Sequence, residues 1–320
     1  MRIHAFGGLS GVGVVVAALL LAASVHAETV KCQRTIAKES AKFVKTQVKT
    51  LQKCEESKVK GKLPALTDCD SEPKVEAEIE KAGSKLKANI EKRCGGADKQ
   101  CGGDLTGEDG GTALGWPAMC PDFDDTPELQ CVLAIGATDC TGIADCLECI
   151  GDDLSDQAME LYYAKLEPTD SSTQQELNTC QQTIGKEASK FLLTKSKALQ
   201  SCWDRRIKGK HADECPDVTA ATKITKAESK FLAKACKRCG GADGLCNGID
   251  DFTAAQIGFE NDCHDVVVPF GGPSCMQDPV TTLTELVTCV DCVTEYRVDC
   301  LDRAQVPQFG AFPAECSPAP

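Results

Sequence analysis

The chain has 320 residues, of which 22 are cysteine and 42% are hydrophobic, and its formal net charge at pH 7 is −13. An acidic total of this size excludes a general role in binding nucleic acid through overall charge. The even number of cysteines predicts a disulfide-bonded protein if the chain enters an oxidising compartment.

The N-terminus has the organisation of a secretory signal. Arg2 supplies a positive charge, residues 11–25 form a short apolar run, and Ala27 completes a small-residue cleavage site before Glu28. We therefore expect a signal peptide over residues 1–27 and a secreted mature protein, periplasmic or extracellular, with no membrane span. The alternative is that this segment remains as an uncleaved membrane anchor.

The rest of the chain contains an internal repeat. The segment CQRTIAKESAKF, which begins at Cys32, recurs as CQQTIGKEASKF at Cys180, and KRCGGAD at Lys92 recurs unchanged at Lys237. Nine cysteines match in order, namely Cys32, Cys54, Cys69, Cys94, Cys101, Cys120, Cys131, Cys146 and Cys149 with Cys180, Cys202, Cys215, Cys239, Cys246, Cys263, Cys275, Cys289 and Cys292. Such repetition indicates two units of one architecture. We expect repeat 1 over residues 28–168 and repeat 2 over residues 169–320, joined by a polar linker from Glu167 to Gln175.

Charge is segregated within each repeat. Residues 28–94 contain 16 basic and 11 acidic residues, whereas residues 95–179 contain 2 basic and 18 acidic residues. Residues 180–239 contain 14 basic and 6 acidic residues, whereas residues 240–320 contain 2 and 13. Each repeat is therefore a basic half followed by an acidic half, and the two are complementary within one molecule or between molecules.

Apolar residues at helical spacing run through both basic halves. They predict helices over residues 32–54 and 73–94 in the first copy, and over 180–202 and 216–239 in the second. Cys-Gly-Gly follows the second helix of each copy, and glycine at that place ends a helix. A further helix is expected from Ile143 to before Pro168, and its counterpart over residues 283–293.

Antiparallel packing of the two helices in each copy predicts their disulfides. It brings the start of the first helix to the end of the second, within the Cα separation of about 7 Å that a disulfide needs. The expected pairs are Cys32 with Cys94, Cys54 with Cys69, Cys180 with Cys239, and Cys202 with Cys215. With the unmatched cysteines added, the first copy has ten and the second has twelve, so each can close its own set.

Three Cys-x-x-Cys pairs are candidate redox or metal sites: Cys146 with Cys149, Cys236 with Cys239, and Cys289 with Cys292. A redox pair normally lies at the start of a helix, where the helix dipole lowers the pKa of the thiol. These pairs lie at the end of a predicted helix or inside one. We therefore expect each cysteine to bond a different loop, with redox or metal chemistry as the alternative.

Catalytic and cofactor-binding residues are not indicated. The histidines after residue 27, His211 and His264, are not matched between the copies, and we interpret them as surface residues. Two acidic loops offer oxygen atoms to calcium, but their spacing differs from the twelve-residue calcium loop. Their residues are Asp98, Asp104, Glu108 and Asp109 in the first copy and Asp243, Asp250 and Asp251 in the second. The other interpretation is a solvated acidic loop, and we expect no cofactor and no resident metal.

A stripe of lysines follows the first predicted helix. Lys38, Lys42, Lys45, Lys49 and Lys53 recur at intervals of three or four residues, on the side away from the apolar stripe, and the second copy retains Lys186, Lys190 and Lys197. This pattern suits contact with an anionic polymer, such as a polysaccharide or a nucleic acid, or with another protein. The alternatives are that the lysines are solvated or face the acidic half of the protein itself. No aromatic residue interleaves them, which disfavours base stacking.

The fold class that follows is mainly α, with two tandem disulfide-stapled repeats, each a helical hairpin followed by a Cys-rich loop region and a further helix. The corresponding function is that of a secreted, non-catalytic, disulfide-rich binding or structural protein. An extracellular redox or metal-handling protein that uses the Cys-x-x-Cys pairs is the alternative. A hydrolase with an unrecognised site is the third hypothesis.

Overall fold

The computed structural model describes residues 12–103, 107–121, 131–163, 174–248 and 250–316, with side chains from residue 28 onward. Over these residues the protein is mainly helical, with eight α-helices, two short 3-10 helices and no strand longer than an isolated bridge. The helices are α1 (Val12–Val59), α2 (Pro73–Cys94), α3 (Gly111–Leu114), α4 (Ile143–Tyr163), α5 (Gln175–Ile207), α6 (Val218–Cys239), α7 (Ala254–Ile257) and α8 (Leu283–Gln305).

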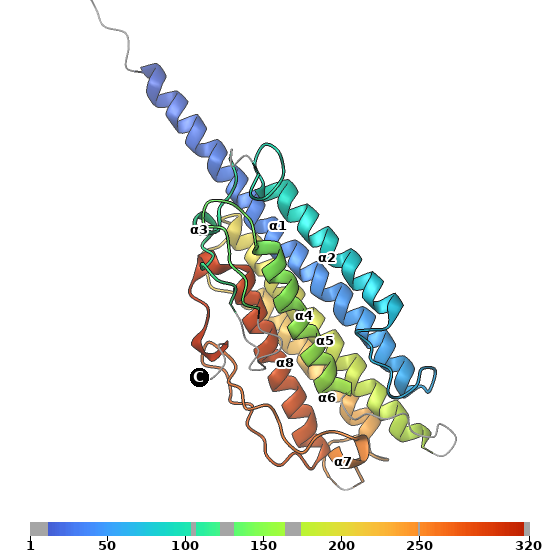
Figure 1. Cartoon of the computed structure of the whole chain (residues 1–320). Coiled ribbons are helices and arrows are strands. Elements are labelled where there is room, and N and C mark those ends of the chain that lie inside the picture. The colour runs from blue at the N-terminus through green and yellow to red at the C-terminus, as the bar shows by residue number, and fades with distance from the viewer. Residues whose placement is uncertain (1–11, 104–106, 122–130, 164–173, 249, 317–320) are drawn as a thin grey trace, which may run out of the picture.

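Helix α1 is longer than the expected helix over residues 32–54. It begins at Val12, inside the expected signal segment, and its N-terminal turns extend beyond the other helices (Figure 1). The apolar stripe marks only the part of a helix that packs against neighbours, so it gives no signal where the helix continues alone. None of the described helices combines the length and the apolar character needed to cross a membrane.

The other helix ends follow local capping chemistry. Glu72 caps α2 by accepting hydrogen bonds from the backbone N–H groups of Lys74 and Val75, and Pro73 takes the first helical position. In α6 the cap is Asp217, so this helix begins at Val218 rather than at Pro216 as expected. Helix α8 begins with a capping box and continues to Gln305, twelve residues beyond the expected end at residue 293.

Four helices surround the centre of the molecule. Helix α1 packs against α4 and α5, and α8 packs against the same two helices on the opposite side. Helix α2 lies outside against α1, and α6 lies outside against α5 (Figure 1). The segments predicted as two separate units are therefore in extensive contact through α1 with α5 and α4 with α8. Residues 167–173 of the expected linker lie outside the described residues, and they include Pro168, the expected end of the helix that begins at Ile143. The last residue of the expected linker, Gln175, begins α5.

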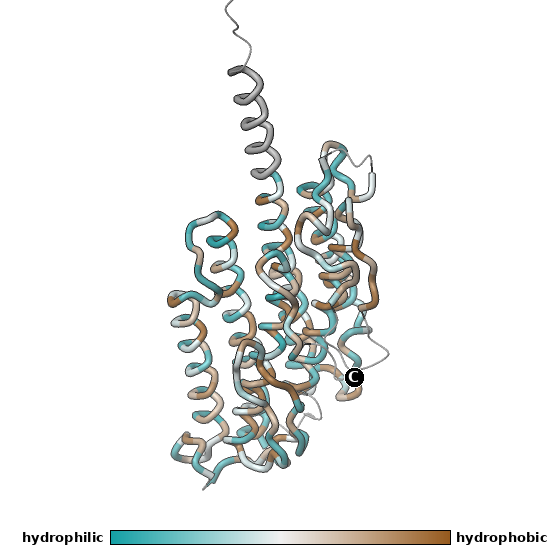
Figure 2. Tube along the Cα trace, turned by 90° about the vertical axis from the view of Figure 1, so that its left-hand side faces the viewer, coloured by the Kyte–Doolittle hydropathy of each residue, from teal (hydrophilic) through white to brown (hydrophobic). Residues whose placement is uncertain are grey.

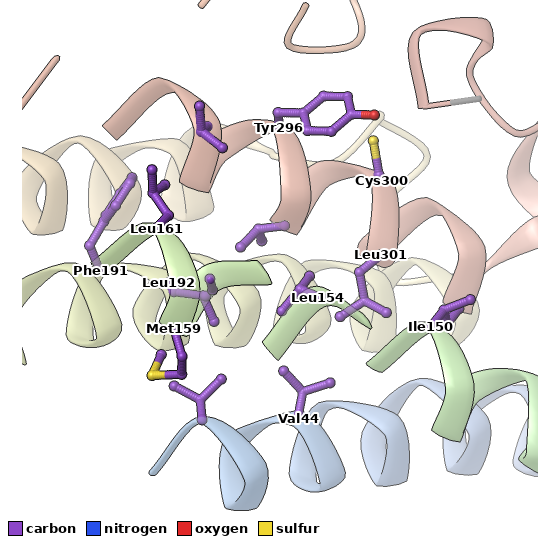
Figure 3. Close-up of a cluster of buried hydrophobic side chains, with 14 of the residues drawn as sticks. Val44, Ile150, Leu154, Met159, Leu161, Phe191, Leu192, Tyr296, Cys300 and Leu301 are labelled. Carbon is purple, nitrogen blue, oxygen red and sulfur yellow. The ribbon is translucent and has the colours of Figure 1, made fainter. Parts of the chain in front are cut away.

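The core fills the space between the four central helices. Figure 3 shows Val44 of α1 facing Met159 and Leu154 of α4, with Leu192 of α5 and Leu301 of α8 completing the cluster. These side chains are almost fully buried. Hydrophobic and hydrophilic residues alternate along the helices (Figure 2), as amphipathic helices require. The loops that contain α3 and α7 lie near opposite ends of the helices (Figure 1), and disulfides fasten both loops.

Candidate functional site

All 22 cysteines lie within the described residues, and none is a free thiol. Both hairpins are closed at each end, and the four pairs are those that antiparallel packing predicts. Their Cα–Cα separations are 5.0 Å for Cys32–Cys94, 5.8 Å for Cys54–Cys69, 5.0 Å for Cys180–Cys239 and 5.9 Å for Cys202–Cys215. The outer disulfides join the beginning of the packed part of the first helix to the last residue of the second.

Each cysteine of the Cys-x-x-Cys pairs bonds a cysteine elsewhere in the chain. On α4, Cys146 bonds Cys120 and Cys149 bonds Cys131. On α8 and α6 the pairs are Cys289 with Cys263, Cys292 with Cys275, Cys236 with Cys246 and Cys239 with Cys180. Thiol exchange uses the two cysteines of the motif together, so this pattern favours the structural role over the redox alternative.

The unmatched cysteines serve the two halves differently. Cys101 bonds Cys140, whereas its sequence counterpart Cys246 bonds Cys236, at the end of α6. The last pair, Cys300 with Cys316, ties the C-terminal segment to α8. Every disulfide joins two cysteines on the same side of the expected linker. This agrees with the expectation that the ten cysteines of the first copy and the twelve of the second pair within their own copy.

The carboxylates of the two acidic loops hold the backbone of those loops. Glu108 accepts hydrogen bonds from the N–H groups of Gly102 and Gly103, and Asp98 accepts one from Gln100. Asp104 lies outside the described residues. In the second half the backbone of the loop donates to Asp243, Asp250 and Asp251. These are turn-forming contacts, which support the interpretation of the carboxylates as structural residues of the loops.

Two groups of side chains have the spacing of metal ligands. One is Cys202, His211 and Cys215, and the other is Cys131, Cys149 and Asp153. Metal ligation by cysteine requires a thiolate, whereas all four of these cysteines are in disulfides. His211 packs beside the Cys202–Cys215 disulfide, with Nε2 3.1 Å from the main-chain oxygen of Cys202. Neither group has the chemistry of a metal centre.

The lysine stripe forms one wall of a groove between α1, α5 and α6. Four lysines of α1 line it together with lysines from the other two helices: Lys38, Lys42, Lys45, Lys49, Lys190, Lys197 and Lys230. Glu187 is the only carboxylate among the lining residues, and the volume of the groove is about 670 Å³. We call this feature the lysine groove. Lys53 and Lys186 are exposed but lie outside it.

Most of these lysines have no ionic partner among the described residues. Lys42 pairs with Glu39 at 2.7 Å, and Lys190 pairs with Glu187 at 2.5 Å. The remaining five, Lys38, Lys45, Lys49, Lys197 and Lys230, form no ion pair within the described parts of the chain. All seven are exposed. The stripe therefore faces outward, and these five lysines form no ion pair with the described residues of the acidic halves.

The floor of the lysine groove is apolar. Phe191 of α5 and Phe231 of α6 stack with their ring centroids 6.3 Å apart, and each is 1% exposed. Ala41, Leu193 and Ala227 also line the groove. Because both rings are covered, they stabilise the packing of α5 against α6 and present no face to a ligand. The chemistry that the groove offers is positive charge on long side chains.

Sequence reasoning missed a buried lysine. The side chain of Lys195 is 5% exposed, and its Nζ lies 3.0 Å from Glu295 Oε1 and 3.0 Å from Asp299 Oδ2. Burial raises the pKa of Asp299 to about 6, although the Lys195 ammonium opposes this shift. The signal was present, because Lys195 lies four residues from Phe191 and from Leu199 and so belongs to the apolar face of α5.

The comparisons with known proteins give no family for this chain: no family model, curated protein or solved structure matches it. Its function must therefore be inferred from its own residues.

Proposed function

We propose that the chain consists of two tandem repeats, with boundaries at residues 28–168 and 169–320. Four disulfides of one half correspond in sequence to four of the other, which supports this division. They are Cys32–Cys94, Cys54–Cys69, Cys120–Cys146 and Cys131–Cys149 with Cys180–Cys239, Cys202–Cys215, Cys263–Cys289 and Cys275–Cys292. A framework in which every cysteine is oxidised is consistent with secretion after removal of residues 1–27.

We propose further that the protein is a non-catalytic binding module whose lysine groove holds an anionic polymer. The single observation that carries this proposal is the convergence of seven exposed lysines from three helices on one groove with one carboxylate. In a chain whose net charge is −13, this local excess of positive charge would attract and concentrate an anionic ligand at the groove.

The length of the lysine row suits a polymer better than a small anion. Lys38 and Lys49 are eleven residues apart on α1, which corresponds to about 17 Å along a helix. Repeated anionic groups along one ligand would match this row, whereas a single phosphate or carboxylate would contact only one or two lysines. An anionic polysaccharide fits better than a nucleic acid, because the aromatic rings below the groove are covered and cannot stack on bases.

The test is binding of the mature protein to immobilised heparin, with neutral dextran as the comparison surface. The triple variant Lys45→Ala/Lys49→Ala/Lys197→Ala removes three groove charges that have no partner in the described structure. The variant Lys62→Ala/Lys74→Ala/Lys92→Ala removes the same charge from exposed positions outside the groove. Exposed charge contacts contribute about 0.2–1 kcal/mol each, so the loss of three should weaken binding by about 0.6–3 kcal/mol, roughly 3- to 150-fold.

The control variant should retain its affinity within about twofold, since screening weakens charges that lie more than about 10 Å away. Equal weakening of the two variants would mean that overall charge rather than the groove binds the polymer. No binding of the wild-type protein to heparin at low salt would reject the proposed ligand class.

A further inference from the structure

A second charged feature of opposite sign lies between α2 and α4. This cleft has a volume of about 650 Å³, and eight carboxylates line it: Asp70, Glu76, Glu80, Asp145, Glu148, Asp152, Asp153 and Asp156. No lysine or arginine is among its lining residues. We call it the acidic cleft. Gln47 of α1 and Ile79 of α2 also line it.

Carboxylates in the acidic cleft stabilise one another only when some carry protons. The carboxyls of Asp70 and Asp156 act on each other's pKa, and a hydrogen bond between two carboxyls requires a proton on one of them. Burial, with the neighbouring carboxylates, raises the pKa of Asp156 to about 8, and burial raises that of Asp152 to about 7. Lys87 pairs with Asp145 at the edge of the cleft, at 3.2 Å, but no described lysine or arginine pairs with Asp152 or Asp156. A cation that enters the cleft beside these two carboxyls would therefore relieve their repulsion.

The second half carries its own cation at the equivalent place. Lys195 follows Cys180 by fifteen residues, and Gln47 follows Cys32 by the same fifteen. The carboxylates that hold Lys195, Glu295 and Asp299, come three and seven residues after Cys292. Asp152 and Asp156 come three and seven residues after Cys149. In the second half, Glu295 and Asp299 thus bind the ammonium group of Lys195. In the first half, the matching Asp152 has the neutral amide of Gln47 beside it.

The amide oxygen of Gln47 lacks a hydrogen-bond partner among the described residues. Gln47 is 2% exposed, and its Nε2 donates a hydrogen bond to Asp152. Its Oε1 is buried and accepts no hydrogen bond from the described residues. A buried acceptor without a donor costs about 1–3 kcal/mol, so a donor that reaches it is favoured. An ammonium group has three N–H donors, enough to reach Gln47 Oε1 and the two carboxylates.

We propose that the acidic cleft binds a ligand that carries primary ammonium groups, which supplies to the first half the charge that Lys195 supplies to the second. Two sources share this chemistry, a free polyamine and the lysine side chains of a basic peptide. The proposal is independent of the lysine groove, because the two features share no lining residue.

The test is isothermal titration of the mature protein with spermine and, separately, with an N-acetylated pentalysine peptide. The variant Gln47→Lys places in the first half the ammonium that the second half has. It should lower the affinity for the bound probe at least tenfold. Ala255→Lys adds the same charge at an exposed position of α7, outside the cleft, and should change the affinity less than twofold. Asp152→Asn/Asp156→Asn should also weaken binding, which keeps the test valid if Gln47→Lys does not fold.

The two probes separate the sources: tighter binding of spermine indicates a polyamine, and tighter binding of pentalysine indicates a basic peptide. Equal weakening by Gln47→Lys and Ala255→Lys would overturn the proposal, because general attraction would then explain the binding. Failure of both probes to bind the wild-type protein would also overturn it. A third outcome would also overturn the proposal: the wild-type protein binds calcium stoichiometrically but neither amine, and Gln47→Lys abolishes calcium binding.

Discussion

Removing the outer disulfide of a hairpin should destabilise the protein more than removing the inner one. Cys32 and Cys94 are 62 residues apart, whereas Cys54 and Cys69 are 15 apart. In the chain-entropy model, closing these loops in the unfolded chain stabilises the fold by about 4.3 and about 3.0 kcal/mol. The expected difference is about 1.3 kcal/mol, because a longer loop restricts the unfolded chain more.

The assay is urea unfolding of the mature protein at 25 °C, followed by circular dichroism. Cys32→Ala/Cys94→Ala is compared with Cys54→Ala/Cys69→Ala. All four cysteines are at most 5% exposed, so loss of side-chain packing affects the two variants similarly. The second hairpin repeats the comparison with separations of 59 and 13 residues. An equal or larger loss on removal of the inner disulfide, in both hairpins, would refute the loop-entropy reasoning.

Three further predictions follow from the charged groups and from the N-terminus. Lys195→Met should lower the free energy of unfolding by about 3–5 kcal/mol, because it leaves Glu295 and Asp299 buried without their ammonium partner. Lys197→Met, at an exposed position, is the control. Equal losses of stability for the two variants in chemical denaturation would contradict the buried ion pair. Thermal stability should fall as the pH rises from 5 to 8. Burial raises the pKa values of Asp152, Asp156 and Asp291 to about 7 or 8, so the folded chain keeps protons that the unfolded chain releases near pH 4. A melting temperature that rises over this pH range would contradict these protonation states. Mass spectrometry of the exported protein should find Glu28 as its first residue, and retention of the preceding apolar segment would contradict secretion as a cleaved protein.

Helix positions were largely predictable because they depend on local signals. The expected helix over residues 73–94 has the bounds of α2, since Pro73 and the glycines after Cys94 are strong start and stop signals. The extents of α1, α5 and α8 were underestimated, because no start or stop signal lies where their apolar stripes were expected to end; α5, for example, spans Gln175–Ile207 rather than residues 180–202. Antiparallel geometry led directly to the hairpin disulfides. By contrast, periodicity cannot reveal that the partner of Cys101 is in a loop while that of Cys246 is on a helix.

The charged features depended on tertiary packing. The stripe from Lys38 to Lys49 was visible in the sequence. The groove that it forms with Lys197 and Lys230 depends on the packing of α1 near α5 and α6, which no local sequence pattern specifies. The ion pairs of Lys195 and the hydrogen bond of Gln47 to Asp152 were hidden for the same reason. Both residues occupy apolar faces of their helices, so a polar residue at an apolar position was the signal that went unused.

The most direct test of the proposed binding function is lysine footprinting. The mature protein is acetylated with and without a saturating amount of heparin, and modification of each lysine is measured by peptide mass spectrometry. Lys45, Lys49 and Lys197 should be protected severalfold by the polymer, while Lys74 and Lys92 should react at unchanged rates. Protection spread evenly over all exposed lysines, or absent from the groove, would contradict the assignment of the lysine groove as the binding site.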